Sequence, residues 1–184
     1  MNLMYDISLI SFKRLSISDL GHLHKWLNCD YVTEWYSKKK WTMEEIQEKY
    51  IPYIKNEKPT RSYLILYNNV PIGYIQTYKI NDYPDYASVV DVDENAAGLD
   101  LFIGEQKYFH KGLGKHIINK FLRNIVFSLS DVESCILGPE PQNIAAIKTY
   151  EKAGFKYIKT IQVEDEDEPE YIMRIGKNEI AEIK

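Results

Sequence analysis

The sequence predicts a single domain of mixed α/β class, in which helices cover the faces of a central sheet. Three observations lead to this fold class. Strand-like and helix-like segments alternate in the order β-α-α-β-β-β-α-β-α-β-β. The length of 184 residues suits one domain, and no repeat or linker divides residues 1–184. The hydrophobic share of 45% and the charged share of 27% are typical of a globular protein.

The first predicted elements are a strand and two helices. Residues 7–14 are expected to form the strand. Ser18 is the expected N-cap of a short helix, because apolar residues follow it at helical spacing. Thr42 begins the second helix with a capping box, since Glu45 stands three residues after the cap. We expect this helix to end near Pro52.

The middle of the chain predicts a hairpin, an acidic loop and another strand. Two β-rich runs, 62–67 and 70–78, are separated by the two-residue turn 68–69, Asn-Asn, which is typical of a hairpin. Residues 79–97 are expected to form a long acidic loop. The short apolar run 98–104 is the next strand.

The last third of the chain predicts two helices among three strands. One helix begins near Gly112 and carries a broad apolar stripe. A strand at 134–137 precedes a second helix at 143–153, which Gly154 closes at the C′ position. The final strands are expected at 155–163 and 170–175.

The net charge of −4 hides an uneven distribution of acidic residues. Two segments, 80–106 and 160–170, carry 13 acids and no Lys or Arg, whereas the rest of the chain is basic. The two segments either face one cationic ligand or are separate solvated loops, and charge alone favours the second interpretation. An acidic cleft would repel phosphates, so we expect no nucleic acid partner.

Several other classes of protein are not expected. The N-terminal residues do not resemble a signal peptide, and no apolar run reaches the ~18–20 residues of a membrane span. We therefore expect a cytoplasmic protein with no membrane partner. Cys29 and Cys135 are far apart and lack CxxC spacing, which indicates free thiols. The four histidines do not form a metal-binding pattern, so no metal is expected.

A glycine-containing loop in the segment 99–117 is a candidate anion site. A strand leads into Gly112-Leu113-Gly114 and then directly into a helix, whose first N–H groups would point at an anion such as a pyrophosphate. Lys111 and Lys115 add positive charge beside it. The alternative is a glycine-rich helix start without a ligand. The full G-x-G-x-x-G and GxxxxGK[ST] patterns are absent.

A second motif, in the segment 139–155, gives the loop a context. Its pattern N-x-x-A-x-x-x-Y-E-K-x-G-F comprises Asn143, Ala146, Tyr150, Glu151, Lys152, Gly154 and Phe155. Together with the glycine loop, this motif resembles the GNAT acetyltransferases. The resemblance implies the GNAT fold, a largely antiparallel sheet of about six to seven strands with helices on both faces, splayed at the acetyl-CoA site. It also implies acyltransferase activity with acetyl-CoA as co-substrate and no metal.

Within this superfamily the chain looks most like the aminoglycoside 6′-N-acetyltransferases, which confer antibiotic resistance. The likeness includes the segments 24–37, 67–78 and 98–105 and the YEKAGF sequence. The implied acceptor is a small polycationic amine, an aminoglycoside. The resemblance implies that the substrate-binding residues are Trp35, Tyr36, Asp85, Asp100 and Asp167.

The resemblance also suggests catalytic and cofactor roles. Asp100 either accepts the proton of the acceptor amine or only anchors its charge. The Tyr150 hydroxyl would protonate the departing CoA sulfur, the alternative being a packed aromatic side chain. Main-chain N–H groups of strand 99–103 would polarise the thioester carbonyl. The implied acetyl-CoA-binding residues are Leu101, Phe102, Ile103, Lys111, Gly112, Leu113, Gly114, Lys115, Asn143 and Ala146.

Two departures from the family pattern leave the acceptor open. Phe109 stands where the family has Gln or Arg, and Gly138 stands where the aminoglycoside enzymes have an Asp before the proline. Other possible acceptors are a siderophore precursor, a polyamine or a protein N-terminus, and another class of function is a non-catalytic CoA-binding module. The protein could be a monomer or a dimer.

Overall fold

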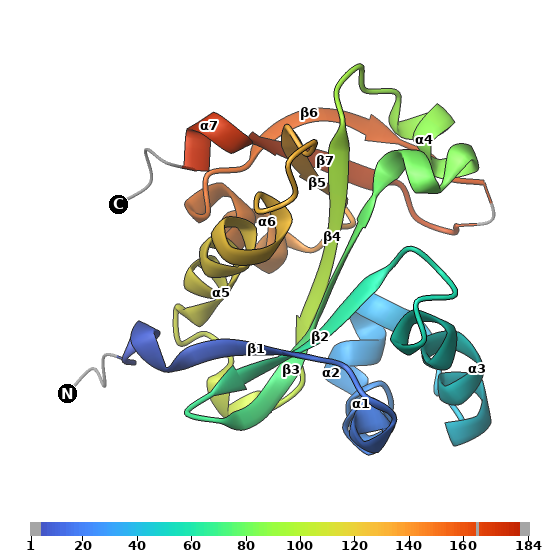
Figure 1. Ribbon diagram of the computed structural model, residues 1–184, viewed down its shortest axis with the longest axis vertical. Coiled ribbons are helices and arrows are strands. Elements are labelled where there is room, and N and C mark those ends of the chain that lie inside the picture. The colour runs from blue at the N-terminus through green and yellow to red at the C-terminus, as the bar shows by residue number, and fades with distance from the viewer. Residues whose placement is uncertain (1–4, 165, 181–184) are drawn as a thin grey trace. The chain divides into compact units, whose positions relative to one another are not determined.

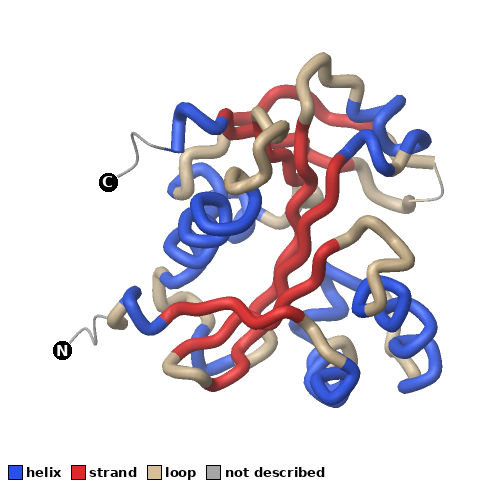
Figure 2. Tube along the Cα trace, viewed as in Figure 1, coloured by secondary structure: helices blue, strands red, loops and turns tan. Residues whose placement is uncertain are grey.

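The computed structural model of the protein describes residues 5–164 and 166–180. It contains two compact units. The first comprises the described residues up to Gln76 and the segment Asp100–Leu113, and the second comprises Thr77–Leu99 and the described residues from Gly114 onward. The seven strands form one sheet in the order β1-β2-β3-β4-β5-β7-β6 (Figures 1 and 2). The predicted α/β class with a mostly antiparallel sheet is confirmed.

The first unit contains the predicted hairpin. Strand β1 (Ile10–Arg14) pairs antiparallel with β2 (Arg61–Tyr67), and β3 (Val70–Lys79) follows after the turn. Asn68 and Asn69 have φ angles of 48° and 61°. Positive φ at both central positions is typical of a type I′ turn, whose twist matches that of the two strands. The hairpin prediction is therefore confirmed.

The helices of the first unit are α1 (Leu20–Trp26), α2 (Asp30–Val32), the π turn η3 (Thr33–Ser37) and α3 (Met43–Ile54). Short 3₁₀ turns stand at η1 (Ile7–Leu9), η2 (Ile17–Asp19) and η5 (Gln106–Tyr108). The capping box is confirmed: Glu45 N donates to Thr42 Oγ1 at 3.2 Å, and Thr42 N donates to Glu45 Oε2 at 2.9 Å.

Three local predictions in this unit were wrong. The residue that caps the first helical segment is Ser16 rather than Ser18, because the Asp19 carboxylate accepts hydrogen bonds from Ser16 N and Oγ at 3.0 and 2.6 Å. The first strand begins at Ile10 rather than residue 7, since Asp6 caps η1. Helix α3 continues past Pro52 to Ile54.

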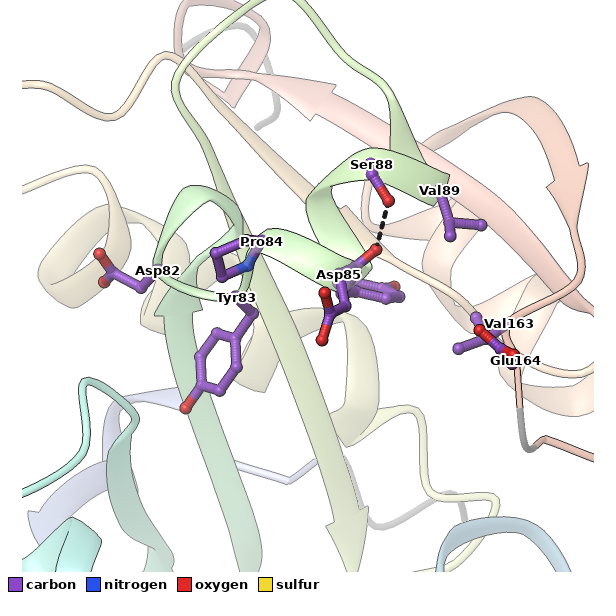
Figure 3. A pocket seen from close by; sticks show the side chains of 9 residues that line it. Asp82, Tyr83, Pro84, Asp85, Ser88, Val89, Val163 and Glu164 are labelled. Atoms are coloured by element: carbon purple, nitrogen blue, oxygen red, sulfur yellow. Dashed lines mark hydrogen bonds between the residues drawn. The ribbon is translucent and has the colours of Figure 1, made fainter.

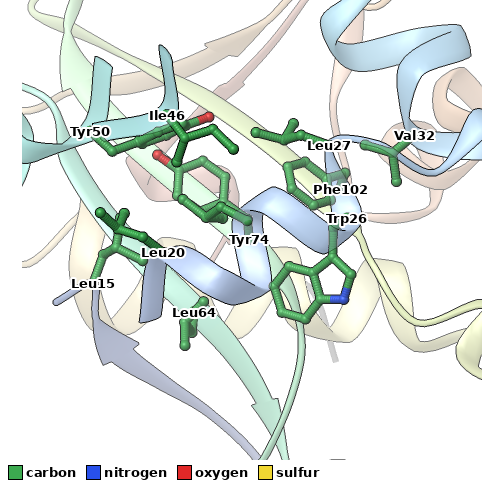
Figure 4. Packing of buried hydrophobic residues seen from close by; sticks show 11 residues of the cluster. Leu15, Leu20, Trp26, Leu27, Val32, Ile46, Tyr50, Leu64, Tyr74 and Phe102 are labelled. Atoms are coloured by element: carbon green, nitrogen blue, oxygen red, sulfur yellow. The ribbon is translucent and has the colours of Figure 1, made fainter. Parts of the chain in front are cut away.

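Large side chains from helices and strands form the core of the first unit (Figure 4). Trp26, Tyr50 and Tyr74 have no exposed surface. The Tyr74 ring stacks on Phe102, with 5.6 Å between the ring centroids. Gly104 allows a close approach, because a Cβ atom there would lie 2.3 Å from the Trp26 indole. This packing holds the end of β4 (Ala96–Ile103) against α1.

The second unit contains the remaining strand pairs. Strand β5 (Ser134–Leu137) is parallel to β4, whereas β7 (Glu170–Gly176) is antiparallel to β5 and to β6 (Lys156–Ile161). The parallel register joins Ala96–Gly98 to Ser134–Ile136 and goes no further, although β4 continues to Ile103. Strands β4 and β5 therefore share only a short stretch of pairing, as expected for a splayed sheet.

Helix α5 (Leu113–Phe121) continues into the π turn η6 (Leu122–Val126), and α6 (Ile144–Lys152) and the short α7 (Lys177–Ile180) follow along the chain. The predicted helix ends are confirmed for α6: Asn143 is its N-cap, and Gly154 has a φ of 100° beyond its C-terminus. Helix α7 was not predicted.

The prediction of an acidic loop over 79–97 was wrong, because the segment contains the 3₁₀ turn η4 (Ile80–Asp82) and helix α4 (Pro84–Val90). Proline at the first position of a helix has a suitable φ and needs no hydrogen-bond partner. Val90 has no exposed surface and packs with Ala96 and Ile172. The apolar face of α4 thus outweighs its acidic flanks. The second acidic segment includes Asp165, which lies outside the described residues.

The described residues include no helix that is both long and apolar enough to cross a membrane. No group of three or more His, Cys, Asp or Glu side chains among them could hold a metal ion. Cys29 is half-buried and Cys135 is buried, and they are not joined by a disulfide.

Candidate active site

The predicted residue Asp100 lies at one end of a chain of hydrogen bonds in the first unit. Gln76 Nε2 donates to Asp100 Oδ2 at 2.7 Å. The Tyr74 hydroxyl donates to Gln76 Oε1 at 2.7 Å, and Ser62 Oγ lies 2.7 Å from the same hydroxyl. The four side chains come from β2, β3 and β4, so the sheet itself sets their spacing.

The chemistry of these groups fixes the direction of each hydrogen bond. An ionised carboxylate only accepts, so the Gln76 amide must present its NH₂ group to Asp100 and its oxygen to Tyr74. The Tyr74 hydroxyl then donates to Gln76 and accepts from Ser62. Ser62 and Tyr74 are buried, whereas Gln76 and Asp100 are half-buried. Hydrogen bonds that begin in the core therefore give the carboxylate a defined position.

The surroundings of Asp100 change its acidity. Burial raises the pKa of this carboxyl group above its ordinary value of 3.8, while the hydrogen bond from Gln76 and the positive charge of Lys49 oppose the rise. Burial also raises the pKa of the phenols of Tyr36, Tyr50 and Tyr74, which are therefore neutral at physiological pH. Asp100 is a stronger proton acceptor than an exposed Asp, in a setting of neutral phenols.

The predicted aromatic residues Trp35 and Tyr36 both lie on η3 but in different surroundings. Tyr36 packs edge-on against Phe102, with 4.7 Å between ring centroids, and the charge of Asp100 contributes to its raised pKa. Trp35 is 38% exposed, and the Lys38 ammonium lies 5.6 Å from its ring centroid. The structure therefore brings Tyr36 near Asp100 and leaves Trp35 on the surface.

The predicted cofactor-binding strand offers its main chain more than its side chains. The Phe102 side chain is buried in the core, while Leu101 and Ile103 are half-buried. Strand β4 continues beyond its short register with β5 through these three residues. Their main-chain groups suit hydrogen bonds to a ligand that lies along this part of the strand.

The glycine loop has the geometry of an anion site in its first part. Gly112 has a φ of 74°, and a Cβ atom there would meet no atom within 4 Å, so the main chain is open to a ligand. Lys111 is exposed beside it, and the Leu113 side chain is buried. Phe109, the unexpected residue, packs edge-on against Tyr31 at 4.9 Å between ring centroids. Aromatic packing thus anchors the loop where the family has a polar residue.

In the second unit, Gly114 lets α5 approach α6 closely, because a Cβ atom there would lie 2.7 Å from Thr149 Cγ2. Lys115 is exposed on the same first turn of α5. Asn143 Oδ1 accepts a hydrogen bond from Ala146 N at 3.1 Å, which is the cap of α6. Tyr150 is half-buried, and its ring lies 6.3 Å from that of Phe155.

A pocket of about 510 Å³ in the second unit brings parts of the two acidic segments together. Figure 3 shows Asp85 on α4 and Glu164 on the chain that follows β6, and Asp82 adds a third carboxylate. Its lining is Asp82, Tyr83, Pro84, Asp85, Tyr86, Ser88, Val89, Val163 and Glu164, with no Lys or Arg. The predicted residue Asp167 is exposed and does not line this pocket.

Sequence reasoning missed the residues that support Asp100. Tyr74 and Gln76 stand two positions apart on β3, so they lie on the same face of the strand, and this spacing was an available signal. Ser62 lies on another strand, and its contact with Tyr74 depends on the pairing of β2 with β3.

The fold and the residues around the glycine loop define the class of the protein. The chain belongs to the GNAT acetyltransferase family, since the family described as acetyltransferase (GNAT) domain matches residues 17–163. The protein is therefore an acyltransferase, as the sequence predicted.

Individual relatives narrow this class. Aminoglycoside N(6′)-acetyltransferase type 1 of Klebsiella pneumoniae is 28% identical over 158 residues, which cover 85% of this chain and 78% of the relative. The crystal structure of aminoglycoside acetyltransferase AAC(6′)-Ib in complex with coenzyme A and kanamycin matches with a TM-score of 0.83 and 26% identity. That match covers 94% of this chain and 98% of the other. A spermidine N-acetyltransferase of Vibrio cholerae, at 17% identity, a TM-score of 0.75 and coverage of 95% and 99%, shares the fold.

Proposed function

We propose that this protein is an acetyl-CoA-dependent N-acetyltransferase that acetylates the 6′-amine of an aminoglycoside and so confers resistance to the antibiotic. The observation that carries the proposal is the extent of the likeness to aminoglycoside 6′-acetyltransferases, which covers 85% of the chain in sequence. Solved structures of such an enzyme, including one that holds coenzyme A and kanamycin, match 94% of the chain. We further propose that the protein is cytoplasmic and that both compact units belong to one catalytic domain.

Acetyl-CoA would supply an acetyl group activated as a thioester. The open main chain at Gly112 supports a pyrophosphate site formed by Gly112, Leu113 and Gly114 with Lys111 and Lys115. We assign the pantetheine arm to Asn143 and Ala146 on α6. The main-chain N–H groups of Leu101 and Ile103 would hydrogen-bond the thioester oxygen as negative charge develops on it, while Phe102 between them would hold the strand against β3.

Asp100 is the proposed proton acceptor. Its carboxylate first binds the acceptor ammonium and then takes a proton, which leaves a neutral amine with a lone pair for attack. The N–C bond forms and the C–S bond then breaks, and Tyr150 donates its hydroxyl proton to the departing sulfur. The new amide nitrogen gives up its remaining extra proton, which restores the Tyr150 hydroxyl through water, and Asp100 then releases its proton to water, so one proton leaves for each acetyl group transferred. The raised pKa of Asp100 supports this role, because a carboxylate with an ordinary pKa is a weaker base.

The remaining proposed residues bind the polycation. Asp85 lines a pocket with three carboxylates and no Lys or Arg, which suits an acceptor that carries several ammonium groups. Tyr36 would pack against a sugar ring near Asp100, and Trp35 and Asp167 would contribute from exposed positions. The assignments of Trp35 and Asp167 come from the resemblance.

The test is the release of CoA from acetyl-CoA by the purified protein. Kanamycin and tobramycin are compared with spermidine, with a hydroxylysine-type amine and with an aminoglycoside that has a 6′-hydroxyl group. We expect turnover on the two 6′-amines and none on the 6′-hydroxyl compound. Turnover on spermidine or on the hydroxylysine-type amine alone would show that the enzyme has another acceptor. Turnover on no amine would contradict the enzymatic proposal.

A further inference from the structure

The carboxyl group of Glu170 occupies the space beside Gly138. A Cβ atom on Gly138 would lie 2.2 Å from Glu170 Oε2, 2.9 Å from its Cδ and 3.1 Å from its Cβ. Gly138 is not among the glycines with positive φ, so its backbone conformation is open to any residue. A side chain at this position would therefore have to displace the Glu170 carboxyl group, and the main chain itself sets no barrier to it.

Two contacts hold Glu170 in this place. It is the first residue of β7, and the next residue, Tyr171, donates its N–H to Pro139 O at 2.8 Å. This bond keeps the start of β7 beside the chain that follows β5. The Tyr86 hydroxyl donates to Glu170 Oε2 at 2.7 Å. The carboxylate is thus fixed both by the sheet and by α4.

The oxygen of Glu170 lies about as far from the Cβ position of residue 138 as the carboxylate oxygens of an aspartate there would lie. In an aspartate, each carboxylate oxygen stands about 2.4 Å from its Cβ, as follows from standard bond lengths. Glu170 Oε2 is 2.2 Å from the Cβ position of residue 138. A side chain from β7 therefore brings a negative charge into the immediate surroundings of this position.

We propose that Glu170 is a substrate-binding residue that supplies the carboxylate which the sequence lacks at Gly138, and that it binds an ammonium group of the polycationic acceptor. The inference rests on the proposed function. Tyr86 connects this carboxylate to the acidic pocket, because Tyr86 also lines that pocket with Asp82, Asp85 and Glu164. Glu170 does not line that pocket itself, but through its contact with Tyr86 it would add a further negative charge next to the pocket for a ligand with several positive charges.

The first test is Glu170→Gln, which removes the charge and retains the shape. We expect KM for kanamycin to rise about tenfold, since one charge-assisted contact is lost, while KM for acetyl-CoA changes less than twofold. Calorimetric titration of the CoA-bound protein with kanamycin should show a similar rise in Kd, which is a loss of affinity. The matched control is Glu48→Gln, which makes the same charge change at an exposed position on α3 and should alter neither constant.

The second test exchanges the two positions. Glu170→Ala should weaken kanamycin binding, and Gly138→Asp in the Glu170→Ala background should bring Kd back to within about threefold of wild type. Gly138→Asp alone should be the most defective, because two carboxylates would compete for one space. A purely structural role of Glu170 would instead lower the melting temperature and leave Kd unrestored by the exchange.

Two outcomes would overturn the inference in different ways. Equal kanamycin affinity in wild type and Glu170→Gln would overturn the role of Glu170 and leave the proposed function standing. If the CoA-bound wild type bound and acetylated no aminoglycoside, the proposed function would fail, and the inference would fail with it.

Discussion

Asp100 and Asp85 are carboxylates in opposite surroundings. Asp100 is held by a chain of hydrogen bonds that begins in the core, and burial raises its pKa. Asp85 is exposed at the start of α4, in a pocket with two other carboxylates. Desolvation makes a carboxylate a better base, whereas solvated charges attract a polycation without a large cost of burial. One residue type can therefore serve proton transfer in one unit and electrostatic attraction in the other.

Asp100→Asn should have the largest effect on turnover. Asparagine retains an oxygen that can accept the Gln76 hydrogen bond but cannot take a proton. We expect kcat to fall by about 10²–10⁴-fold, the usual contribution of a general base. The Kd for CoA, measured by calorimetry, should change less than twofold. Turnover equal to that of wild type would leave Asp100 as an anchor at most.

Tyr150→Phe tests whether the Tyr150 hydroxyl donates a proton to the departing CoA sulfur. We expect kcat to fall by about 10–100-fold, because the departing sulfur would lose its proton donor. The melting temperature should stay within a few degrees, since the half-buried ring and its contact with Phe155 are retained. Unaltered kinetics would identify Tyr150 as a packing residue.

Gln76→Leu should change the pH dependence of the activity. The Gln76 hydrogen bond lowers the pKa of Asp100, so its loss should raise that pKa further. Activity requires the ionised carboxylate, and therefore the acid limb of the kcat/KM profile should move to higher pH. The control is Gln47→Leu at an exposed position on α3. If the acid limb does not move, Gln76 does not influence the pKa of the group that controls activity.

Asp85→Asn should have the smallest effect. We expect KM for kanamycin to rise by about threefold at low salt, because an exposed carboxylate contributes a screened attraction. At high ionic strength the difference from wild type should disappear. A large fall in kcat that persists at high salt would contradict a purely electrostatic role and would indicate that Asp85 takes part in catalysis, as proposed for Asp100.

Local chemistry predicted the elements whose signals are contained in a few neighbouring residues. The Thr42 capping box and the Asn68-Asn69 turn needed no tertiary information. The cap at Ser16 was missed because Ser18 stands nearer to the first apolar residues of the helix. The residue that decides the cap is Asp19, whose carboxylate accepts a hydrogen bond from Ser16 Oγ. Helix α4 was missed because acidic composition obscured Pro84 at its first position and the buried Val90.

Only those residues of the candidate site that belong to a recognisable sequence motif could be predicted. Asp100, Gly112 and Asn143 belong to motifs, whereas the chain from Ser62 through Tyr74 and Gln76 depends on the pairing of three strands. The close approach of the Glu170 side chain to Gly138 brings together two residues that are distant in sequence. Neither contact could be derived without strand order and register.

The close approach of Glu170 to Gly138 also couples what can be substituted at the two positions. While position 170 holds Glu, a side chain added at Gly138 would have to displace the Glu170 carboxylate from its place and from its hydrogen bond with the Tyr86 hydroxyl. The effect of a substitution at position 138 should therefore depend on the residue at position 170. The two positions are expected to show epistasis, although they lie 32 positions apart along the chain.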